Sequence, residues 1–303
     1  MNISSALRSV RTSTSLTGLT PTEFWSLVPL FEANFLEQRN ILLQSRTRKV
    51  GGGRKGHLAT SADKLFAALL YLKSYPTFDV LGFMLNMERT RACRNVHLLL
   101  PVLEKTLGRQ LVLPKRQIHS MEEFLSLFPE VKDVFIDGSD RRVQRPRNPK
   151  KQNKLYSGKR KTTTRKNVVV ADEKKQILYL TPTKSGRRHD KRLLDKSGIE
   201  NLPDNITAWV DTGFVGLPKI HANTQIPKKH TKGRTLSYEE KQNNRLIASF
   251  RVVVEHAICG MKRMRAATDV YRNRKINFDD KLTLLSAGIW NYHLRFAPNY
   301  SGN

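Results

Sequence analysis

Apolar residues in the first third of the chain recur at helical spacing. Thr20 and Glu23 fit a capping box, and Pro21 suits the first position of a helix, so a helix is predicted from Pro21. Pro29 is expected to kink this helix. After a basic, Gly-rich segment, apolar stripes predict three short helices at residues 63–74, 78–86 and 90–107. The short turn between the last two of them is typical of a helix-turn-helix.

The first 110 residues therefore divide into three predicted segments. Residues 1–45 form a helical segment, residues 46–60 a linker, and residues 61–110 a small all-α helix-turn-helix domain. The linker contains Arg54 and Lys55, and two interpretations of it stay open. It is either a plain flexible linker or an arm laid along DNA, with these two side chains in a minor groove.

The rest of the chain mixes strand and helix patterns. Apolar runs at 134–137 and 207–211 predict buried strands that each end in an aspartate. Two β-rich runs, 162–171 and 176–183, flank the polar turn 172–175 and predict a hairpin. Helices are predicted at residues 190–196, 238–264 and 281–296. These parts predict an α/β catalytic domain over residues 121–298, with a mixed sheet of the ribonuclease-H-like type.

The long helix predicted at 238–264 has two informative faces. A buried apolar stripe is expected at Leu246, Phe250, Val253, Ala257, Met261 and Met264. A neighbouring face carries residues about one turn apart, namely Arg251, Glu255, Ile258 and Lys262.

The charge of the chain points to a polyanionic partner. Lys and Arg number 54 against 26 Asp and Glu, which gives a net charge of +28. Nucleic acid is the first candidate for the partner. Residues 141–192 alone hold 19 Lys or Arg and 3 Asp or Glu. This basic block is either a solvated loop or a surface that binds a phosphate backbone, with Lys159, Arg160 and Lys161 as expected contacts.

Three carboxylates of the chain suit metal-dependent chemistry on nucleic acid. Asp137 and Asp211 close the two predicted strands, and Glu255 lies within the long predicted helix. Two divalent cations about 4 Å apart can activate an attacking oxygen and stabilise the leaving one, and they prefer hard anionic oxygen ligands. Each acid also has an ordinary explanation, because the aspartates can cap turns and Glu255 can pair with Arg251.

Four polar residues near these acids are weaker candidates. Asp140 follows Asp137 by three residues, and His256 is adjacent to Glu255 on the helix. His189 and Asp190 precede a predicted helix, for which Asp190 is also a plain N-cap. We expect these residues at most to support the acids.

The helix-turn-helix offers a different set of contacts. In this motif the N-terminal part of the second helix enters the major groove. Arg89, Arg91, Arg94 and Asn95 face away from the apolar stripe and are therefore expected to contact bases or phosphates. Arg251 and Lys262 are further expected DNA contacts. A small helical bundle with a basic surface is the alternative.

Several classes of protein are disfavoured. Cys93 and Cys259 lie far apart and outside any Cys/His cluster, so neither a disulfide framework nor a zinc site is indicated. The sequence contains no P-loop, dinucleotide fingerprint or recognisable Ser or Cys nucleophile motif. No apolar run approaches the length of a membrane span, so no membrane partner and a cytoplasmic location are expected.

Several longer phrases carry a family resemblance. They are LLYLKSYPTFDVLGFMLNM from Leu69, IDGSDRRVQRP from Ile136, YSGKRKTTTRKNVVV from Tyr156, SGRRHDKRLLDKSG from Ser185, WVDTGF from Trp209 and RVVVEHAICGMKRMR from Arg251. With these phrases the chain resembles the DDE-type transposases of bacterial insertion sequences, a group related to the Harbinger-type nucleases. The phrases run through roughly four-fifths of the chain in family order.

The resemblance implies a function. Asp137, Asp211 and Glu255 match the three catalytic acids of the family, which would hold two Mg²⁺ ions, with Mn²⁺ able to substitute. Such a protein would bind the terminal inverted repeats of its element on double-stranded DNA, cut the strand and transfer it to a target. Pairing two ends implies at least a homodimer, associated with the bacterial nucleoid. The alternative is a catalytically idle, transposase-derived DNA-binding regulator.

Overall fold

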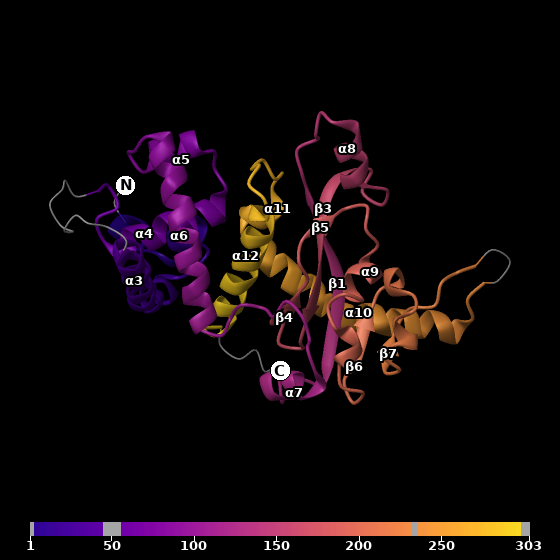
Figure 1. Cartoon of the computed structure of the whole chain (residues 1–303). Helices are drawn as coiled ribbons and strands as arrows, with labels where there is room; N and C mark the ends of the chain where they lie inside the picture. The colour runs from indigo at the N-terminus through magenta and orange to yellow at the C-terminus, as the bar shows by residue number, and fades with distance from the viewer. Residues whose placement is uncertain (1–2, 45–55, 232–234, 298–303) are drawn as a thin grey trace. The chain divides into compact units, whose positions relative to one another are not determined.

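The computed structural model describes residues 3–44, 56–231 and 235–297 (Figure 1). The chain forms two compact units, one of residues 1–113, 262–267 and 285–303 and one of residues 114–261 and 268–284. This division differs from the four consecutive segments expected along the sequence, whose boundaries stay a prediction. No helix among the described residues is long and apolar enough to cross a membrane.

The first unit is helical. Its helices in the first 113 residues are α1 (Ile3–Ala6), α2 (Val10–Thr17), α3 (Pro21–Gln44), α4 (Ser61–Ser74), α5 (Phe78–Met84) and α6 (Arg89–Arg109). The predicted capping box of α3 is present, because the Thr20 amide donates to Glu23 Oε2 at 2.9 Å and the Glu23 amide donates to Thr20 Oγ1 at 3.3 Å. Helix α3 continues through Pro29 without a break. Its buried face includes Phe24 and Phe31.

Helices α4, α5 and α6 confirm the three short helices predicted from the sequence, within about three residues at each end. Gly82 of α5 packs directly on the turn before α6, because a Cβ at this position would lie 2.6 Å from the Met87 carbonyl oxygen. The Met87 amide donates to the Gly82 carbonyl oxygen at 2.8 Å. This close approach fixes the turn between α5 and α6.

The second unit contains a mixed sheet. Its strands are β1 (Asp133–Arg142), β2 (Tyr156–Ser157), β3 (Thr162–Ala171), β4 (Ile177–Leu180), β5 (Lys184–Ser185), β6 (Thr207–Val210) and β7 (Thr224–Gln225). The order β2-β3-β1-β6-β7 is extended by β4 and β5, which both pair with β3. Strand β3 is antiparallel to β1 and β4, whereas β6 is parallel to β1 and β7. The α/β class with a ribonuclease-H-like sheet is confirmed.

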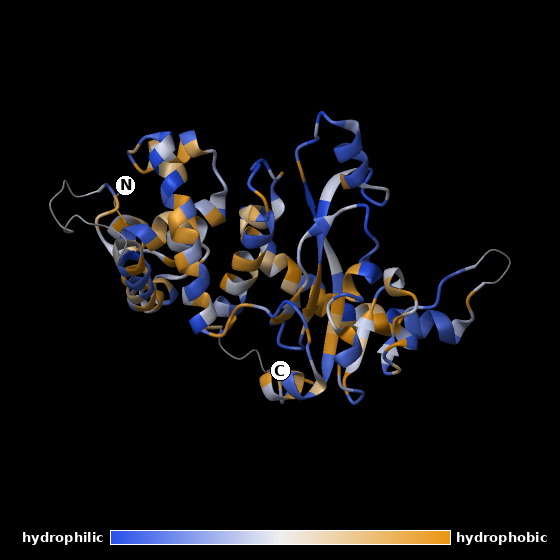
Figure 2. Ribbon diagram, viewed as in Figure 1, coloured by the Kyte–Doolittle hydropathy of each residue, from blue (hydrophilic) through white to orange (hydrophobic). Residues whose placement is uncertain are grey.

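Helices cover both faces of this sheet. Besides the sheet the unit contains α7 (Met121–Leu127), α8 (Pro149–Leu155), α9 (Asp190–Leu194) and most of α10 (Tyr238–Lys262), while α11 (Arg265–Thr268) and α12 (Phe278–Leu294) have residues in both units. On one face Ile136, Val168 and Val210 pack with Leu194 of α9. Figure 2 shows hydrophobic residues along the central strands of the sheet. On the other face, the Trp209 ring stacks on Phe250 of α10, with 4.5 Å between ring centroids.

Strand β1 is longer than predicted. It was expected to end at Asp137, but it pairs with β3 without interruption from Phe135 to Arg142. The charged residues after Gly138 look like a turn in the sequence, yet the fold provides partners for them. Arg141 donates to the Asp269 carbonyl oxygen at 2.9 Å and lies over the Tyr271 ring. The interpretation of residues 141–192 as a solvated loop is wrong, because β3, β4 and α8 lie within this block.

The predicted buried stripe of α10 is partly wrong. Leu246 is 52% exposed and Phe250 is 43% exposed, whereas Ile247, Val254 and Ile258 are buried. Ala257, Met261 and Met264 are buried as predicted. The difference lies mainly in the N-terminal part of the helix, where Phe250 stacks on Trp209 and stays partly exposed.

The turn between β3 and β4 gives a testable pH dependence. The Asp172 side chain is buried and accepts the Gln176 amide at 2.8 Å. Burial raises the pKa of Asp172 from 3.8 to about 6, despite this hydrogen bond. Because the folded-state pKa lies above the unfolded value, this carboxyl favours folding below about pH 4, and that contribution is lost as the pH rises through 6.

Replacing Asp172 with Asn is therefore expected to stabilise the protein above pH 6. At about 1.4 kcal/mol per pKa unit, the free energy of unfolding at pH 7.5 should rise by about 2–3 kcal/mol, and its slope between pH 4 and 6 should flatten. Urea unfolding at several pH values measures both quantities. Asp204→Asn, at an exposed aspartate, is the control and should change neither. An Asp172→Asn protein no more stable than its parent at pH 7.5 would contradict the prediction.

Candidate active site

Two of the three acids lie side by side on the sheet. Ile136 of β1 is in register with Val210 of parallel β6, so Asp137 and Asp211 follow at the same level. Asp137 and Phe135 lie on the same face of β1, because side chains alternate along a strand. Phe135 stacks on Trp209, and Trp209 stacks on Phe250 of α10. This face of β1 is therefore the one that α10 covers.

The Asp137 carboxylate is largely shielded from solvent. Its Oδ1 accepts the Gly138 amide at 2.7 Å, and Arg251 Nη2 of α10 lies 3.6 Å from its Oδ2. Burial raises the pKa of Asp137, and the negative charge of Asp211 raises it further. The Gly138 amide, Arg251 and Lys159 act in the opposite direction. Asp137 is thus a desolvated anionic site beside a second carboxylate.

Asp211 is held by the turn that follows β6. It caps the short 3₁₀ helix Thr212–Phe214, and its Oδ1 accepts the Gly213 amide at 2.7 Å. A Cβ on Gly213 would lie 2.8 Å from this same oxygen, so the turn suits glycine. Asp211 therefore does cap the turn, as its ordinary explanation holds. The same hydrogen bond fixes its carboxylate at the end of the strand.

Glu255 lies on α10, one turn beyond Arg251, and its side chain is exposed. Arg251 forms its ion pair with Asp137, and none to Glu255 is found among the described residues. Within residues 3–44, 56–231 and 235–297, no group of three or more His, Cys, Asp or Glu side chains is arranged to hold a metal ion. The structure brings Asp137 and Asp211 together and leaves Glu255 outside a closed cluster.

The available groups nevertheless suit a hard cation. Asp137 is a largely shielded carboxylate whose ionised form is disfavoured by desolvation and by Asp211. A divalent cation bound between two such carboxylates would relieve both effects, and carboxylate oxygens are the ligands that Mg²⁺ prefers.

Asp140 does not face Asp137. The two residues are three positions apart on an uninterrupted strand, so their side chains lie on opposite faces of β1. Asp140 instead contacts Arg160 Nε at 3.3 Å and accepts the Thr164 hydroxyl at 3.3 Å.

Asp190 lies on that same opposite face. Its carboxylate packs against Gly138, where a Cβ would lie 3.1 Å from Asp190 Cγ, and Lys166 Nζ lies 2.9 Å from its Oδ1. His189 and His256 are exposed. No sequence pattern indicated the largely buried Lys166–Asp190 pair, because its partners come from β3 and α9.

The expected DNA contacts of the helix-turn-helix lie on the surface. Arg89, Arg91 and Arg94 of α6 are exposed, and Arg89 lies 3.6 Å from Asp79 of α5 in an open ion pair. Asn95 is half-buried, and its amide lies 3.4 Å from Met87 Sδ. Arg54 and Lys55 fall outside the described residues.

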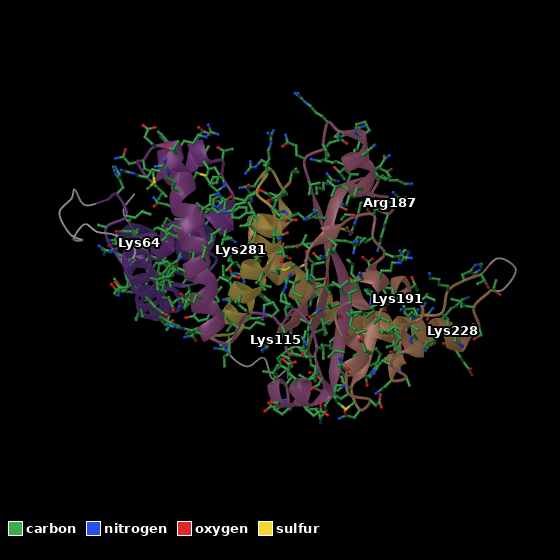
Figure 3. The ribbon with its side chains drawn as sticks, viewed as in Figure 1. Lys64, Lys115, Arg187, Lys191, Lys228 and Lys281 are labelled. Atoms are coloured by element: carbon green, nitrogen blue, oxygen red, sulfur yellow. The ribbon has the colours of Figure 1, made fainter. Side chains whose placement is uncertain are left out.

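The remaining expected DNA contacts lie on two elements. Lys159, Arg160 and Lys161 form the exposed turn between β2 and β3. Lys262 is the last residue of α10 and belongs to the first unit. A large groove beside α9 is lined by eight Lys or Arg, six of which belong to the basic block of residues 141–192; Arg187 and Lys191 are labelled in Figure 3. The sequence indicated a basic block but not that its residues gather in one groove.

Comparisons with known proteins agree with this geometry. The family described as DDE superfamily endonuclease matches residues 136–291, and the helix-turn-helix of DDE superfamily endonuclease matches residues 56–109. The chain is 28% identical over 276 residues to a probable transposase for insertion sequence element IS702 from Microchaete diplosiphon. This match covers 91% of the chain and 96% of that protein. No solved structure matches the chain. The chain therefore belongs to the DDE superfamily endonuclease family, among the DDE-type transposases of insertion sequences.

Proposed function

We propose that this protein binds the terminal inverted repeats of its own element through the helix-turn-helix and cuts and joins DNA strands with the second unit. The observation that carries the proposal is the pair of neighbouring carboxylates, Asp137 on β1 and Asp211 directly after β6, with Asp137 beside the helix that bears the third acid. Family membership supports the same assignment.

Asp137, Asp211 and Glu255 would hold two Mg²⁺ ions, for which Mn²⁺ can substitute. When bound, these cations activate the attacking water or 3′-hydroxyl and stabilise the leaving oxygen. The Gly138 and Gly213 amides keep the Asp137 and Asp211 carboxylates oriented before DNA arrives. Water attack would leave a 3′-hydroxyl, which then attacks a target phosphodiester. Both steps are in-line displacements at phosphorus, so one site serves both.

The helix-turn-helix would supply sequence preference, and phosphate contacts would supply affinity. Arg251 lies beside Asp137 and would place a positive charge near the scissile phosphate. Lys159, Arg160, Lys161 and Lys262 would contact the backbone, and Arg54 and Lys55 would reach a minor groove. Pairing two ends requires at least a dimer, and a protein bound in this way would associate with the nucleoid.

Replacing Arg91, Arg94 and Asn95 with Ala is expected to reduce preference for the repeat over random DNA by about 10–100-fold. A bidentate base contact is worth about 1–3 kcal/mol, and these residues lie at the N-terminal part of α6. A competition binding assay measures the preference. Arg8→Ala with Arg11→Ala removes two exposed arginines from the same unit and should leave it unchanged. An unchanged preference in the triple variant would move recognition to residues 46–57.

A catalytically idle DNA-binding regulator is the second candidate function. The observations in its favour are the ion pair of Arg251 with Asp137 and the exposed position of Glu255. Strand cleavage of DNA carrying the ends of the element, with and without Mg²⁺, separates the two functions. Mg²⁺-dependent cleavage at the ends supports the transposase, and specific binding without cleavage supports the regulator.

A further inference from the structure

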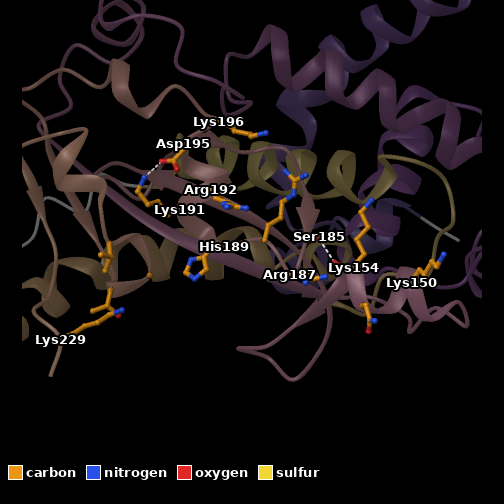
Figure 4. A pocket seen from close by; sticks show the side chains of 15 residues that line it. Lys150, Lys154, Ser185, Arg187, His189, Lys191, Arg192, Asp195, Lys196 and Lys229 are labelled. Atoms are coloured by element: carbon orange, nitrogen blue, oxygen red, sulfur yellow. Dashed lines mark hydrogen bonds and ion pairs between the residues drawn. The ribbon is translucent and has the colours of Figure 1, made fainter. Parts of the chain in front are cut away.

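A groove of about 1110 Å³ lies on the surface of the second unit beside α9 (Figure 4). We call it the α9 groove. Its walls are α8, the segment Ser185–His189, α9 with the residues after it, and the turn that follows β6. Eight of its fifteen lining residues are Lys or Arg, and Asp195 is its single carboxylate. The groove is therefore strongly positive.

Most of these cations are available to a ligand. Lys150, Lys154, Arg188 and Arg192 are exposed, and among the described residues no ion pair is found for them. Lys191 is different, because its Nζ lies 2.7 Å from Asp195 Oδ1. The one acid of the groove is thus already neutralised by a groove lysine, and the remaining positive charge has no counterpart within the groove.

The walls of the groove are fixed by buried contacts. Ser185 Oγ donates to the carbonyl oxygen of Lys154 at 2.6 Å and so ties α8 to β5. A Cβ on Gly186 would clash with Thr164 Oγ1, so the chain here packs directly on β3. The buried Lys166 ties α9 to β3 through Asp190. The cationic side chains therefore project from a rigid frame, which lowers the entropy cost of binding.

The α9 groove adjoins the proposed active site without containing its acids. Thr212 and Gly213, which follow Asp211 directly, line the groove. Gly138, which follows Asp137, packs on Asp190 at the start of α9. Asp137 itself faces α10 on the other side of the sheet, where Arg251 lies 3.6 Å from its carboxylate. A ligand in the groove would therefore pass close to the scissile position but would not be the strand that is cut.

The chemistry of the lining identifies the class of ligand. Single-stranded nucleic acid is usually held by several large aromatic side chains that stack on its bases, and the fifteen lining residues include no Phe, Tyr or Trp, with His189 as the single ring. A small anion would require a few converging, buried donors, whereas these cations are exposed and spread along several elements. We propose that the α9 groove binds the phosphodiester backbone of a DNA duplex beside the strand being cut, without reading its sequence.

Two sources could supply this duplex. It is either the DNA that flanks the end of the element or the target into which the end is joined. Both present the same backbone, and only the reaction step that needs the groove differs. This choice rests on the proposed function, whereas the binding of duplex DNA by the groove does not.

The first experiment measures affinity for random duplex DNA against salt concentration with the full chain. Replacing Lys150, Lys154 and Arg192 with Ala should make the slope of the log–log plot less steep by about 2–3, because each lost phosphate contact removes about 0.9. The control replaces Lys132, Lys219 and Arg245, which are exposed, outside the groove and of the same total charge. Its slope should change by less than about 1. Equal slopes for the two triple variants would overturn the proposal.

The second experiment identifies the source. If the groove holds flanking DNA, the groove variant should lose about tenfold in cleavage of ends with long flanks and little with short flanks. If it holds target DNA, cleavage should persist, and strand transfer from a pre-cut end should fall about tenfold. Absence of cleavage in the parent would refute the proposed function alone, because the salt dependence still tests the groove. A groove variant equal to the control in binding, cleavage and transfer refutes the groove.

Discussion

Asp137→Asn, Asp211→Asn and Glu255→Gln are each expected to reduce cleavage and strand transfer by about 10³-fold, while DNA affinity changes little. Metal ligands of this kind contribute several kcal/mol to stabilising the transition state, and about 1.4 kcal/mol corresponds to a tenfold change in rate. Phosphate binding by Lys and Arg does not need these carboxylates. The fold should survive in the Asp137 variant, because burial already disfavours its charged form.

The measurement is the rate of Mg²⁺-dependent cleavage and joining of DNA that carries the ends of the element, with affinity measured in parallel. Asp140→Asn is the matched control, because it removes an aspartate from the same strand but from the opposite face. It should retain substantial activity. A variant of any of the three acids that cuts at close to the parental rate would remove that residue from the proposed ligand set.

The elements of both units could be predicted largely from local patterns. Capping residues and apolar spacing located α3, α4, α5 and α6, since these signals lie within the elements that they define. The end of β1 could not be predicted, because Arg141 is buried only with the help of Asp269 and Tyr271, more than a hundred residues away. Similarly, the partial exposure of Phe250 on α10 accompanies its stacking on Trp209, a contact that apolar spacing within the helix does not reveal.

The candidate site was also predictable only in part. The sequence placed Asp137 and Asp211 at neighbouring strand ends, and the parallel register of β1 with β6 agrees with that placement. It could not separate Asp140 from Asp137, because the separation depends on β1 continuing as a strand through Gly138. The sequence suggested Glu255 as the ion-pair partner of Arg251, but the partner in the structure is Asp137. This pairing likewise depends on tertiary packing.

Asp280, in the first turn of α12, connects three segments of the second unit. Its Oδ1 accepts the Thr183 amide at 2.7 Å and the Thr183 hydroxyl at 2.8 Å. Arg116 Nη2 donates to both of its oxygens, at 2.6 and 2.8 Å. The Arg116 and Asp280 side chains are 28% and 26% exposed, so removing the carboxylate would leave a guanidinium that is mostly shielded from water and without its counter-charge.

Asp280→Ala is therefore expected to lower the free energy of unfolding by about 3–4 kcal/mol, because breaking a largely buried pair leaves one charge uncompensated. Asp280→Asn keeps an oxygen for the Thr183 amide and should cost about half as much. Urea unfolding of the full chain at pH 7.5 measures both. Glu130→Ala, which removes a fully open pair with Lys174, is the control and should have no measurable effect. If Asp280→Ala unfolds at the same urea concentration as Glu130→Ala, the contacts of Asp280 do not stabilise the fold.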